Sequence, residues 1–455
     1  MVHTKPFKTA RITLNGDTLS PVAIFKRLQG NRKFLLESSL KHEASGRYSF
    51  IGANPVKEFR GLATELVETS FLTGETTKYS GKPIELLKKL LPSVVDMDDF
   101  PFMGGAVGYI GYDTIALYEN IGLALPDDRV MPDLHLLVYE TIVIYDHLKQ
   151  DVTILHTGNT PNNMVEIELQ LAIKECEDVS IQASHPFISN MTKQTFIENV
   201  KRAKEQIVNG EIFQVVLSQR LQTPYEGSPF ALYRKLRKEN PSPYMFYVDF
   251  DEHVVLGASP ESLLSIQGNQ VTTNPIAGTR RRGKSPAEDA MLEKELLSDP
   301  KEIAEHRMLV DLGRNDLGHI CEIGSIHLTK YMEVEKYQHV MHIVSEVAGT
   351  LKADHHPLDA LVACLPAGTV SGAPKIRAMQ IIQELENVKR GVYAGAVGYI
   401  GFNGNIDTAL AIRTIVVKDR MAYVQAGAGI VYDSVPEAEY EEILHKTQSL
   451  LEVLS

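Results

Sequence analysis

One seven-residue segment that occurs twice constrains the fold of this chain more than any other feature of its sequence. The segment GAVGYIG fills residues 105–111 and returns, residue for residue, at 395–401. Glycine at alternate positions of a strand lets another backbone approach closely, and an internal repeat indicates a repeated structural unit. The repeat therefore predicts two related sheets. The alternative is that each copy only marks the point where two packed sheets cross, and we favour it for the first copy.

Strand and helix patterns occur in blocks along the chain. Alternating apolar residues predict strands at 134–145 and 421–426, whereas apolar residues at helical spacing predict helices at 196–207, 300–312 and 436–452. This is not the strict alternation of strand and helix that produces a parallel sheet. The pattern predicts an α+β fold with large antiparallel sheets.

The most linker-like part of the chain is the stretch 178–192, which is rich in Asp, Ser, Pro and Asn. A chain of 455 residues is long enough for two intimately packed domains. We therefore expect an N-terminal domain at 1–177 and a C-terminal domain at 190–455.

The charge balance argues against nucleic acid and membrane as partners. The chain has 46 Lys and Arg against 58 Asp and Glu, a formal net charge of −12, so its surface repels phosphate backbones and anionic lipids. No apolar run approaches the roughly 20 residues that cross a bilayer, and the first residues lack the apolar core of a signal peptide. We expect a cytoplasmic protein that captures any small anion locally, with Arg side chains and backbone N–H groups.

The three cysteines, Cys176, Cys321 and Cys364, lie far apart and form no CxxC spacing. Neither a disulfide framework nor a zinc knuckle is indicated. We interpret them as buried or incidental thiols.

Two pairs of carboxylates lie on predicted helices, Glu302 with Glu305 and Glu439 with Glu442. A spacing of three residues places each pair on one helical face. A single pair of this kind is more often a solvated helix face. Two pairs that converge would enclose a site that only a cation can neutralise, and all-oxygen ligands without histidine favour Mg²⁺.

A glycine-rich segment and an arginine predict an anion site. Small residues at 425–430, QAGAGI, leave the backbone N–H groups of a turn bare, and such a concavity binds carboxylates. Arg413 precedes it in the predicted core strand 410–415, where an unpaired guanidinium is costly. Its partner is either Asp407, in a structural ion pair, or a dianionic substrate, which we prefer.

Two further motifs have the composition of functional segments. The segment 365–375, LPAGTVSGAPK, opens a predicted helix at 376–385, and helix N-termini favour anions. Glu261 follows an apolar strand in the motif GASPES at 257–262. Partial desolvation raises the pKa of a carboxyl group, as a general acid requires.

Together these motifs resemble the chorismate-utilising synthases, and within that family most of all anthranilate synthase component I. The segments that carry the resemblance are PIAGTR at 275–280, AEHRMLVDLGRND at 304–316, PAGTVSGAPK at 366–375 and QAGAG at 425–429. It covers the chain from about residue 195 to its end with high specificity, and 35–38 and 46–52 with lower specificity. The resemblance implies a two-layer sandwich of antiparallel sheets with helices outside, and a regulatory N-terminal domain beside a catalytic one.

The implied reaction converts chorismate and ammonia into anthranilate and pyruvate, on the way to tryptophan. Glu261 matches the general acid that protonates the departing hydroxyl group. His342 matches the histidine that assists the loss of pyruvate, although without the resemblance it reads as a core residue. The residues that match the substrate clamp are Gly278, Thr279, Tyr393, Arg413, Gly427, Ala428 and Gly429.

The resemblance also implies a metal. Glu305 and Glu442 match the ligands of Mg²⁺, while Glu302 and Glu439 act through water. The ion holds the ring carboxylate of chorismate and polarises the allylic system.

Two positions separate this chain from related activities. Salicylate and isochorismate synthases carry a Lys base for water where this chain has Gln214, which cannot accept a proton. Aminodeoxychorismate synthases commonly carry a nucleophilic Lys at the place of Ala277. Ammonia should therefore attack the ring directly. Since nothing resembles a glutaminase with its nucleophilic Cys, the expected partner is a separate glutamine amidotransferase subunit.

Four residues resemble the family's tryptophan feedback site, namely Ser38, Pro243, Tyr244 and Met245. Bound tryptophan would favour one of two domain arrangements by its differential affinity. The alternative is that Pro241 and Pro243 merely shape a turn.

Two rival functions remain. The nearest rival function is that of aminodeoxychorismate synthase component I, since one subunit can keep the PIAGT segment or serve two pathways. A non-catalytic tryptophan-sensing protein on the same fold is the rival from another class. Intact Glu261, Glu305, Glu442 and His342 argue against it.

Overall fold

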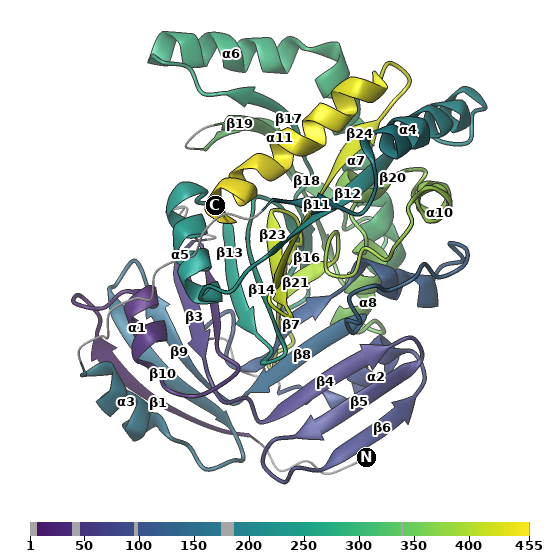
Figure 1. Ribbon diagram of the computed structural model, residues 1–455. Helices are drawn as coiled ribbons and strands as arrows, with labels where there is room; N and C mark the ends of the chain where they lie inside the picture. Colours follow the sequence, from purple (N-terminus) through teal and green to yellow (C-terminus); the bar gives the residue numbers. More distant parts are fainter. Residues whose placement is uncertain (1–6, 39–45, 95–98, 174–185, 338–339, 455) are drawn as a thin grey trace.

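Two large antiparallel sheets form the centre of the protein. The computed structural model describes residues 7–38, 46–94, 99–173, 186–337 and 340–454. Each sheet has twelve strands, and the paired strands within both run antiparallel (Figure 1). The predicted α+β fold with a two-layer sandwich is confirmed.

We call the two sheets A and B. The strands of sheet A are, in spatial order, β1 (Lys8–Asn15), β10 (Asp151–Gly158), β9 (Thr141–Asp146), β3 (Tyr48–Gly52), β2 (Phe34–Glu37), β13 (Tyr244–Asp249), β14 (His253–Ser259), β23 (Thr414–Lys418), β24 (Met421–Ile430), β12 (Gln214–Pro224) and β11 (Ile188–Ser189), with β20 (Gly372–Ala373) paired to β12. The strands of sheet B are β17 (Ile276–Arg281), β19 (Val340–Thr350), β16 (Gln270–Thr273), β15 (Ser262–Gln267), β22 (Ile406–Leu410), β21 (Ala396–Gly401), β7 (Gly105–Ile110), β8 (Leu134–Tyr139), β4 (Lys57–Leu62), β5 (Glu65–Ser70) and β6 (Thr76–Ser80), with β18 (His327–Lys336) paired to β19.

Helices cover the outer faces of the sheets. They are α1 (Pro21–Arg27), α2 (Pro83–Leu90), α3 (Met164–Leu171), α4 (Lys193–Val208), α5 (Pro229–Glu239), α6 (Pro286–Ser298), α7 (Pro300–Ile320), α8 (Pro357–Cys364), α9 (Gly368–Ser371), α10 (Lys375–Leu385) and α11 (Pro436–Leu454), with a 3₁₀ helix at Tyr112–Leu117. Six of them begin at a side chain that accepts a hydrogen bond from the first turn, at Ser20, Thr192, Ser228, Ser285, Asp299 and His356. Local sequence therefore sets where these helices start.

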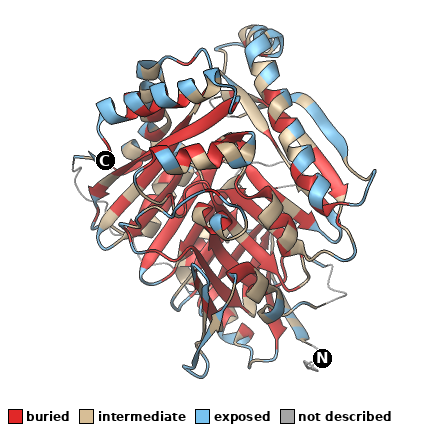
Figure 2. Cartoon of the chain, turned by 90° about the vertical axis from the view of Figure 1, so that its right-hand side faces the viewer, coloured by how far each residue is buried: buried red, intermediate tan, exposed pale blue. Residues whose placement is uncertain are grey.

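Three apolar layers hold the sheets and helices together. Side chains from the facing sides of the two sheets, such as Phe34, Phe102 and Tyr399, fill the layer between them. A second layer packs sheet A against α1, α3, α5 and the end of α11. A third packs sheet B, β12 and β24 against the remaining long helices, including α4, α7 and α10. In Figure 2 the strands are largely buried and the outward faces of the helices are exposed.

The two copies of GAVGYIG form β7 and β21, which are neighbours in sheet B. Gly398 lies opposite Gly108, and the pairing extends in register from Ala396 with Ile110 to Gly401 with Gly105. The expectation that the copies lie in two related sheets is therefore wrong, because they pair with each other in one sheet. A Cβ atom on Gly108 would lie 2.0 Å from the carbonyl oxygen of His135, so close packing requires glycine there.

This pairing joins two halves of equivalent topology. In sheet A, β1, β10, β9, β3 and β2 mirror β12, β24, β23, β14 and β13 across the β2–β13 pair. In sheet B, β6, β5, β4, β8 and β7 mirror β19, β16, β15, β22 and β21. The second half contains additional elements, namely β11, α4, β17, α6, α7, β18, α9, β20 and α10.

The predicted division into 1–177 and 190–455 stays a prediction. Its linker falls mostly on residues 174–185, outside the described residues. The two segments do not form separate layers, since each contributes strands to both sheets.

Several predicted elements differ from the structure in their limits. The expected strand 134–145 is two strands, β8 and β9, which belong to different sheets and meet at Glu140. The predicted helix 300–312 continues to Ile320. Cys321 and Cys364 are buried free thiols, as expected, whereas Cys176 lies outside the described residues. Among the helices that the structure describes, none is long and apolar enough to cross a membrane.

A buried histidine lies between the sheets without a hydrogen-bond partner. His253 on β14 is 2% exposed and stacks on Phe250, with ring centroids 4.8 Å apart. Neither ring nitrogen of His253 has a partner among the described residues. Burial lowers its pKa to about 2, with smaller contributions in the same direction from the nearby His135, Arg60 and Lys418.

We predict that His253→Phe weakens the acid sensitivity of folding. The unfolded chain protonates His253 below its ordinary pKa of about 6.5, whereas the folded chain keeps it neutral, so stability falls as pH falls. From pH 7 to pH 5 this amounts to about 2 kcal/mol. Urea unfolding at both pH values should show a smaller loss for His253→Phe than for wild type. The exposed His319→Gln serves as control, and equal losses in His253→Phe and wild type would contradict the assignment.

Candidate active site

Two passages of the chain between the sheets lie side by side at the centre of the candidate site. One connects β14 to β15 through Pro260 and Glu261, and the other connects β22 to β23 through residues 411–413. The Ser259 hydroxyl donates to the carbonyl oxygen of Leu410 at 2.7 Å, and the Leu410 N–H donates to the carbonyl oxygen of Glu261 at 3.0 Å. These bonds hold Glu261 close to the start of the second passage.

Glu261 has the environment expected of a general acid. It is 7% exposed, and burial raises the pKa of its carboxyl group to about 8. One hydrogen bond opposes this shift: Thr369 Oγ1 donates to Glu261 Oε1 at 2.7 Å. At neutral pH the carboxyl group therefore carries a proton.

Arg413 occupies the second passage. The expectation of a core strand at 410–415 is wrong at this residue, because β22 ends at Leu410 and β23 begins at Thr414. Arg413 has a φ of +50°, a backbone conformation that side chains other than glycine seldom adopt. This bend lies where the chain passes from sheet B to sheet A.

The guanidinium of Arg413 has no carboxylate within ion-pair distance among the described residues, Asp407 included. Its Nη1 reaches only the Ser449 hydroxyl, at 3.4 Å. Burial lowers its pKa. A half-buried cation without a counter-ion among the described residues favours an anionic ligand, which agrees with the preferred interpretation from the sequence.

Gly427 and Gly429 lie on β24, which is a strand along its whole length. The predicted turn at 425–430 is wrong, since these residues pair with β12. β24 pairs with β23 only as far as Val424, so its other edge is open beyond that point. Lys446 donates to the Gly427 carbonyl oxygen at 3.0 Å across this edge. Because Gly427 and Gly429 have the same orientation in the strand, their N–H groups also face the open edge.

Tyr393 approaches the bare backbone of Gly427. A Cβ atom there would lie 2.8 Å from the Tyr393 hydroxyl group. The ring of Tyr393 lies 5.7 Å from the guanidinium carbon of the buried Arg390. Burial keeps the pKa of Tyr393 far above its usual range, so its hydroxyl group can donate a hydrogen bond.

Glu305 and Glu442 reach the Gly427–Gly429 segment from two helices. Gln214 Nε2 donates to Glu305 Oε1 at 3.1 Å, and a Cβ atom on Gly429 would lie 2.6 Å from the same nitrogen. Lys446, which binds Gly427, also pairs with Glu442 Oε1 at 2.7 Å. Each carboxylate is thus one contact away from the Gly427–Gly429 segment of β24.

The other carboxylate of each pair has its own environment. Glu302 Oε1 accepts from Arg280 at 3.2 Å, and its Oε2 would be 3.2 Å from a Cβ atom on Gly278. Burial raises the pKa of Glu439, the Glu442 carboxylate raises it further, and Lys301 lowers it. Lys301 on α7 is therefore close enough to Glu439 on α11 for its charge to act on this carboxylate.

The donor set fits an oxygen-preferring cation that completes its shell with other ligands. Among the described residues, no group of three or more acidic, His or Cys side chains is arranged to hold a metal ion. Mg²⁺ in proteins commonly uses one or two carboxylates, with water and substrate oxygens as its remaining ligands. Glu305 and Glu442 are suited to that role.

His342 lies beside the glycine-containing bulge of β17. Its Nδ1 is 3.0 Å from the Gly278 carbonyl oxygen and 3.1 Å from Thr279 Oγ1. A carbonyl oxygen only accepts, so Nδ1 carries a proton and Nε2 has a free lone pair. Burial lowers the pKa of His342, which favours this neutral form. Gly278 has a φ of +68°, which glycine adopts without strain.

The predicted tryptophan-site residues lie together at one end of the β2–β13 pair. Ser38 follows β2, and its hydroxyl oxygen is buried without a partner among the described residues. Met245 lies opposite Glu37, and Tyr244, which follows Pro243, lies opposite Ser259 at the start of the first passage. Burial keeps the pKa of Tyr244 far above its usual range.

Three neighbours of the site were not among the predicted residues. Lys446, Arg390 and Thr369 touch Gly427, Tyr393 and Glu261, respectively. The spacing of Lys446 four residues after Glu442 was a usable signal. Thr369 is 108 positions away from Glu261, so local pattern could not place it. Arg390 lies only three residues before Tyr393, but both are outside the helices and strands, so no helix or strand spacing linked them.

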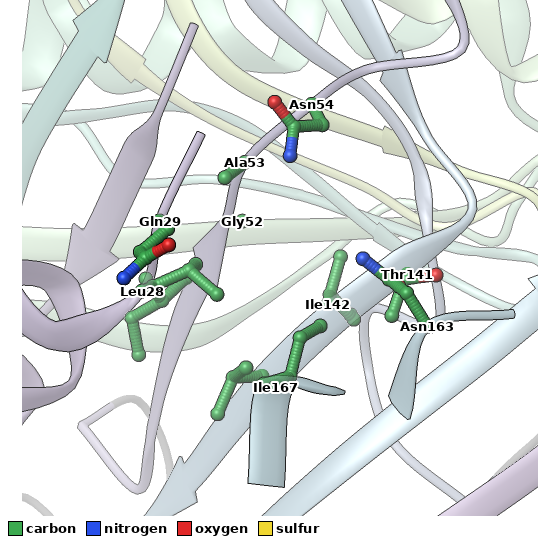
Figure 3. A pocket seen from close by; sticks show the side chains of 11 residues that line it. Leu28, Gln29, Gly52, Ala53, Asn54, Thr141, Ile142, Asn163 and Ile167 are labelled. Carbon is green, nitrogen blue, oxygen red and sulfur yellow. The ribbon is translucent and has the colours of Figure 1, made fainter. Parts of the chain in front are cut away.

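The first half of the chain does not repeat this site. Its own passage, GANP at 52–55, resembles GASP at 257–260. The small cavity beside it is lined by uncharged side chains, among them Asn54, Thr141 and Asn163 (Figure 3). Glu140 precedes β9 as Arg413 precedes β23, and it accepts from Thr160 N–H at 3.0 Å. This half therefore lacks the unpaired cation.

Comparison with known proteins agrees with this geometry. The family of chorismate binding enzymes matches residues 31–452. Anthranilate synthase component 1 of Lactococcus lactis subsp. lactis is 48% identical over 457 residues, covering 97% of this chain and 98% of the relative. The protein of the same name from Acetivibrio thermocellus is 44% identical, covering 100% and 97%.

Solved structures show the same relationship. Anthranilate synthase component I from Streptococcus pneumoniae superposes with a TM-score of 0.81 at 42% identity, over 96% of this chain and 98% of that one. The menaquinone-specific isochorismate synthase from Escherichia coli, with a TM-score of 0.75 at 18% identity over 99% and 95%, shares the fold. The resemblance seen in the sequence is confirmed, and the chain belongs to the family of chorismate binding enzymes.

Proposed function

We propose that the protein is the chorismate-binding subunit of an anthranilate synthase, a lyase that converts chorismate and ammonia into anthranilate, pyruvate and water. The observation that carries the proposal is the pairing of a buried, protonated Glu261 with a half-buried Arg413 that has no carboxylate partner among the described residues, at neighbouring passages between the sheets. The names of its full-length relatives support the choice of product.

Substrate binding follows from the charges of the site. Chorismate carries two carboxylates, and Arg413 offers a desolvated cation to one of them. The backbone N–H groups of Gly427 and Gly429 on the open edge of β24 and the hydroxyl group of Tyr393 supply further donors. Gly278 and Thr279 bound the opposite side through their contacts with His342.

Amination needs a proton at the leaving group. Ammonia forms a bond to the ring carbon beside the one that bears the carboxylate, the ring double bonds shift, and the C–O bond to the hydroxyl group breaks. Glu261, protonated at neutral pH, donates its proton to that hydroxyl group, which leaves as water.

Elimination then needs a base. The neutral His342 presents Nε2 because Nδ1–H is held by the Gly278 carbonyl oxygen. It accepts the proton from the carbon that carries the new amine, the C–O bond to the enolpyruvyl group breaks, and the ring becomes aromatic. Glu261 can act as the acid and His342 as the base at the same pH, because burial raises the pKa of a carboxyl group and lowers that of an imidazole.

We also propose that Mg²⁺ completes the site, held by Glu305 and Glu442. When bound, the ion would neutralise the ring carboxylate of chorismate and polarise the allylic system. Without a cation, two carboxylates and a dianionic substrate would repel one another at the open edge of β24. Glu302 and Glu439, which neighbour this pair, would act through water.

Two residues favour ammonia over other nucleophiles. Gln214 is 4% exposed and donates to Glu305, so its amide cannot deprotonate water. Ala277 on β17 cannot form a covalent adduct with the ring.

The remaining parts of the proposal are a separate glutamine amidotransferase subunit as the source of ammonia, feedback inhibition by tryptophan at Ser38, Pro243, Tyr244 and Met245, and a cytoplasmic location.

We predict that the purified chain releases anthranilate and pyruvate from chorismate with Mg²⁺ and ammonium at alkaline pH, but not with glutamine. Anthranilate is detected by its fluorescence and pyruvate by coupled reduction. Glu261→Gln should lower the rate at least about 100-fold, because general acid catalysis contributes that much. Aminodeoxychorismate as product would favour the rival synthase, and tryptophan binding without turnover would favour a sensor.

For the metal, we predict that Glu305→Gln and Glu442→Gln weaken Mg²⁺ binding by about 10-fold to 100-fold, because each removes a charged ligand. The readout is calorimetric titration with Mg²⁺, together with rates as a function of Mg²⁺ concentration. Glu441→Gln, next to Glu442 but paired with Lys193 on the surface, is the matched control. Unchanged Mg²⁺ affinity in both variants would reject these ligands.

For regulation, we predict that Ser38→Phe and Met245→Thr each raise the tryptophan concentration for half-inhibition by at least about 10-fold. Ser38→Phe puts a phenyl ring where the buried Ser38 hydroxyl group lies, and Met245→Thr adds a hydroxyl group without a partner at a buried position. Inhibition is measured at fixed chorismate. The exposed Met291→Thr is the control. Wild-type inhibition in both variants would reject the site.

A further inference from the structure

The segment 366–375 has no role in the proposed reaction, although it was singled out in the sequence. The structure brings it to Glu261. Thr369 Oγ1 donates to Glu261 Oε1 at 2.7 Å, across 108 positions of the chain. The expected anion site at the start of the following helix is not needed to explain this segment.

Thr369 lies on α9, whose backbone is held by hydrogen bonds from two side chains. The Ser371 hydroxyl donates to the Ala367 carbonyl oxygen at 2.8 Å. Arg390 Nη1 donates to the Val370 carbonyl oxygen at 2.7 Å, and Arg390 itself is 1% exposed and paired with Glu386. The backbone of α9 is thus held in place on both sides of Thr369.

The same helix packs on the element that carries Glu305. A Cβ atom on Gly368 would lie 2.2 Å from a methyl carbon of Leu312 on α7, so glycine lets the two helices meet closely. On the other side, Gly372 and Ala373 pair with Val215 and Gln214 of β12. The position of Thr369 is therefore coupled to both walls of the site.

No charged group competes with Thr369 for Glu261. The charged and titratable groups on the strands and passages next to this carboxyl group include Asp407 on β22, Tyr244 on β13, Arg413 in the second passage, and His253 on β14 with Lys418 on β23. Among the described residues, burial and the Thr369 hydrogen bond alone affect the protonation of Glu261. Its orientation then depends on one neutral hydroxyl group.

We propose that Thr369 is the positioning residue of the general acid: its hydroxyl group, held by α9, fixes one oxygen of Glu261 and leaves the other to face the departing hydroxyl group of the substrate. This inference rests on the proposed function. Thr369 touches Glu261 and acts through it.

The hydrogen bond also sets the pH range of the acid. It favours the ionised carboxyl group, against the effect of burial. Its removal raises the pKa of Glu261 from about 8, so the acid stays protonated to higher pH. Loss of one hydrogen bond to a charged group should displace the pH dependence of the rate by about one pH unit.

The test compares Thr369→Val, which is nearly isosteric and lacks the hydroxyl group, with Thr369→Ser, which keeps it. Rates with chorismate, Mg²⁺ and a fixed ammonium concentration are measured from pH 6 to pH 10 and divided by the wild-type rate, which cancels the titration of ammonium. For Thr369→Val the ratio should be about 0.1 near pH 7, from lost orientation, and should rise about tenfold towards pH 10. For Thr369→Ser it should not vary with pH.

A ratio for Thr369→Val that is independent of pH, or Thr369→Ser behaving like Thr369→Val, would overturn the inference while the wild type remains active. A wild-type chain without anthranilate production would instead overturn the proposed function. If Thr369→Val does not fold, as judged by thermal unfolding, Thr369→Ala removes the same hydroxyl group and takes its place under the same criteria.

Discussion

At 259–262 and again at 410–414, the chain leaves one sheet for the other, and the two passages are tied to each other by hydrogen bonds. Residues 260–261 and 411–413 lie between the strands and have no ladder partner, so their backbone must be satisfied locally. The Ser259 hydroxyl and the Leu410 N–H do this. Side chains that leave these passages are enclosed by both sheets, which is why Glu261 is protonated at neutral pH and Arg413 lacks a counter-ion.

The same pair of passages exists in the first half of the chain, where it produces no site. Val56 follows Pro55 where Glu261 follows Pro260, and Glu140 precedes β9 where Arg413 precedes β23. Glu140 is satisfied by Thr160. The architecture therefore supplies enclosed corners, and the chemistry depends on which side chains occupy them. Thr279, Glu305 and Thr369 all lie on elements that only the second half possesses.

Local sequence was sufficient to predict where the helices begin and which residue types form the site. Caps such as Asp299 mark helix starts, and the helical spacing of Glu302 and Glu305 is visible without coordinates. Periodicity does not record which sheet a strand joins. The continuous apolar pattern at 134–145 therefore concealed the change of sheet at Glu140, and the one around Arg413 concealed its bend. Small residues at 425–430 were mistaken for a turn because an open strand edge exposes N–H groups just as a turn does.

Regulation and catalysis share one strand pair if tryptophan binds where we propose. Tyr244 of the regulatory set lies opposite Ser259, whose hydroxyl closes the first passage two residues before Glu261. A ligand that favours a different position of β13 must move β14 with it or break their ladder, and breaking several backbone bonds costs more than moving the strand. The hydrogen bond between Ser259 and Leu410 is then the first contact to change. Feedback needs only a small displacement of an acid whose orientation depends on a single hydroxyl group.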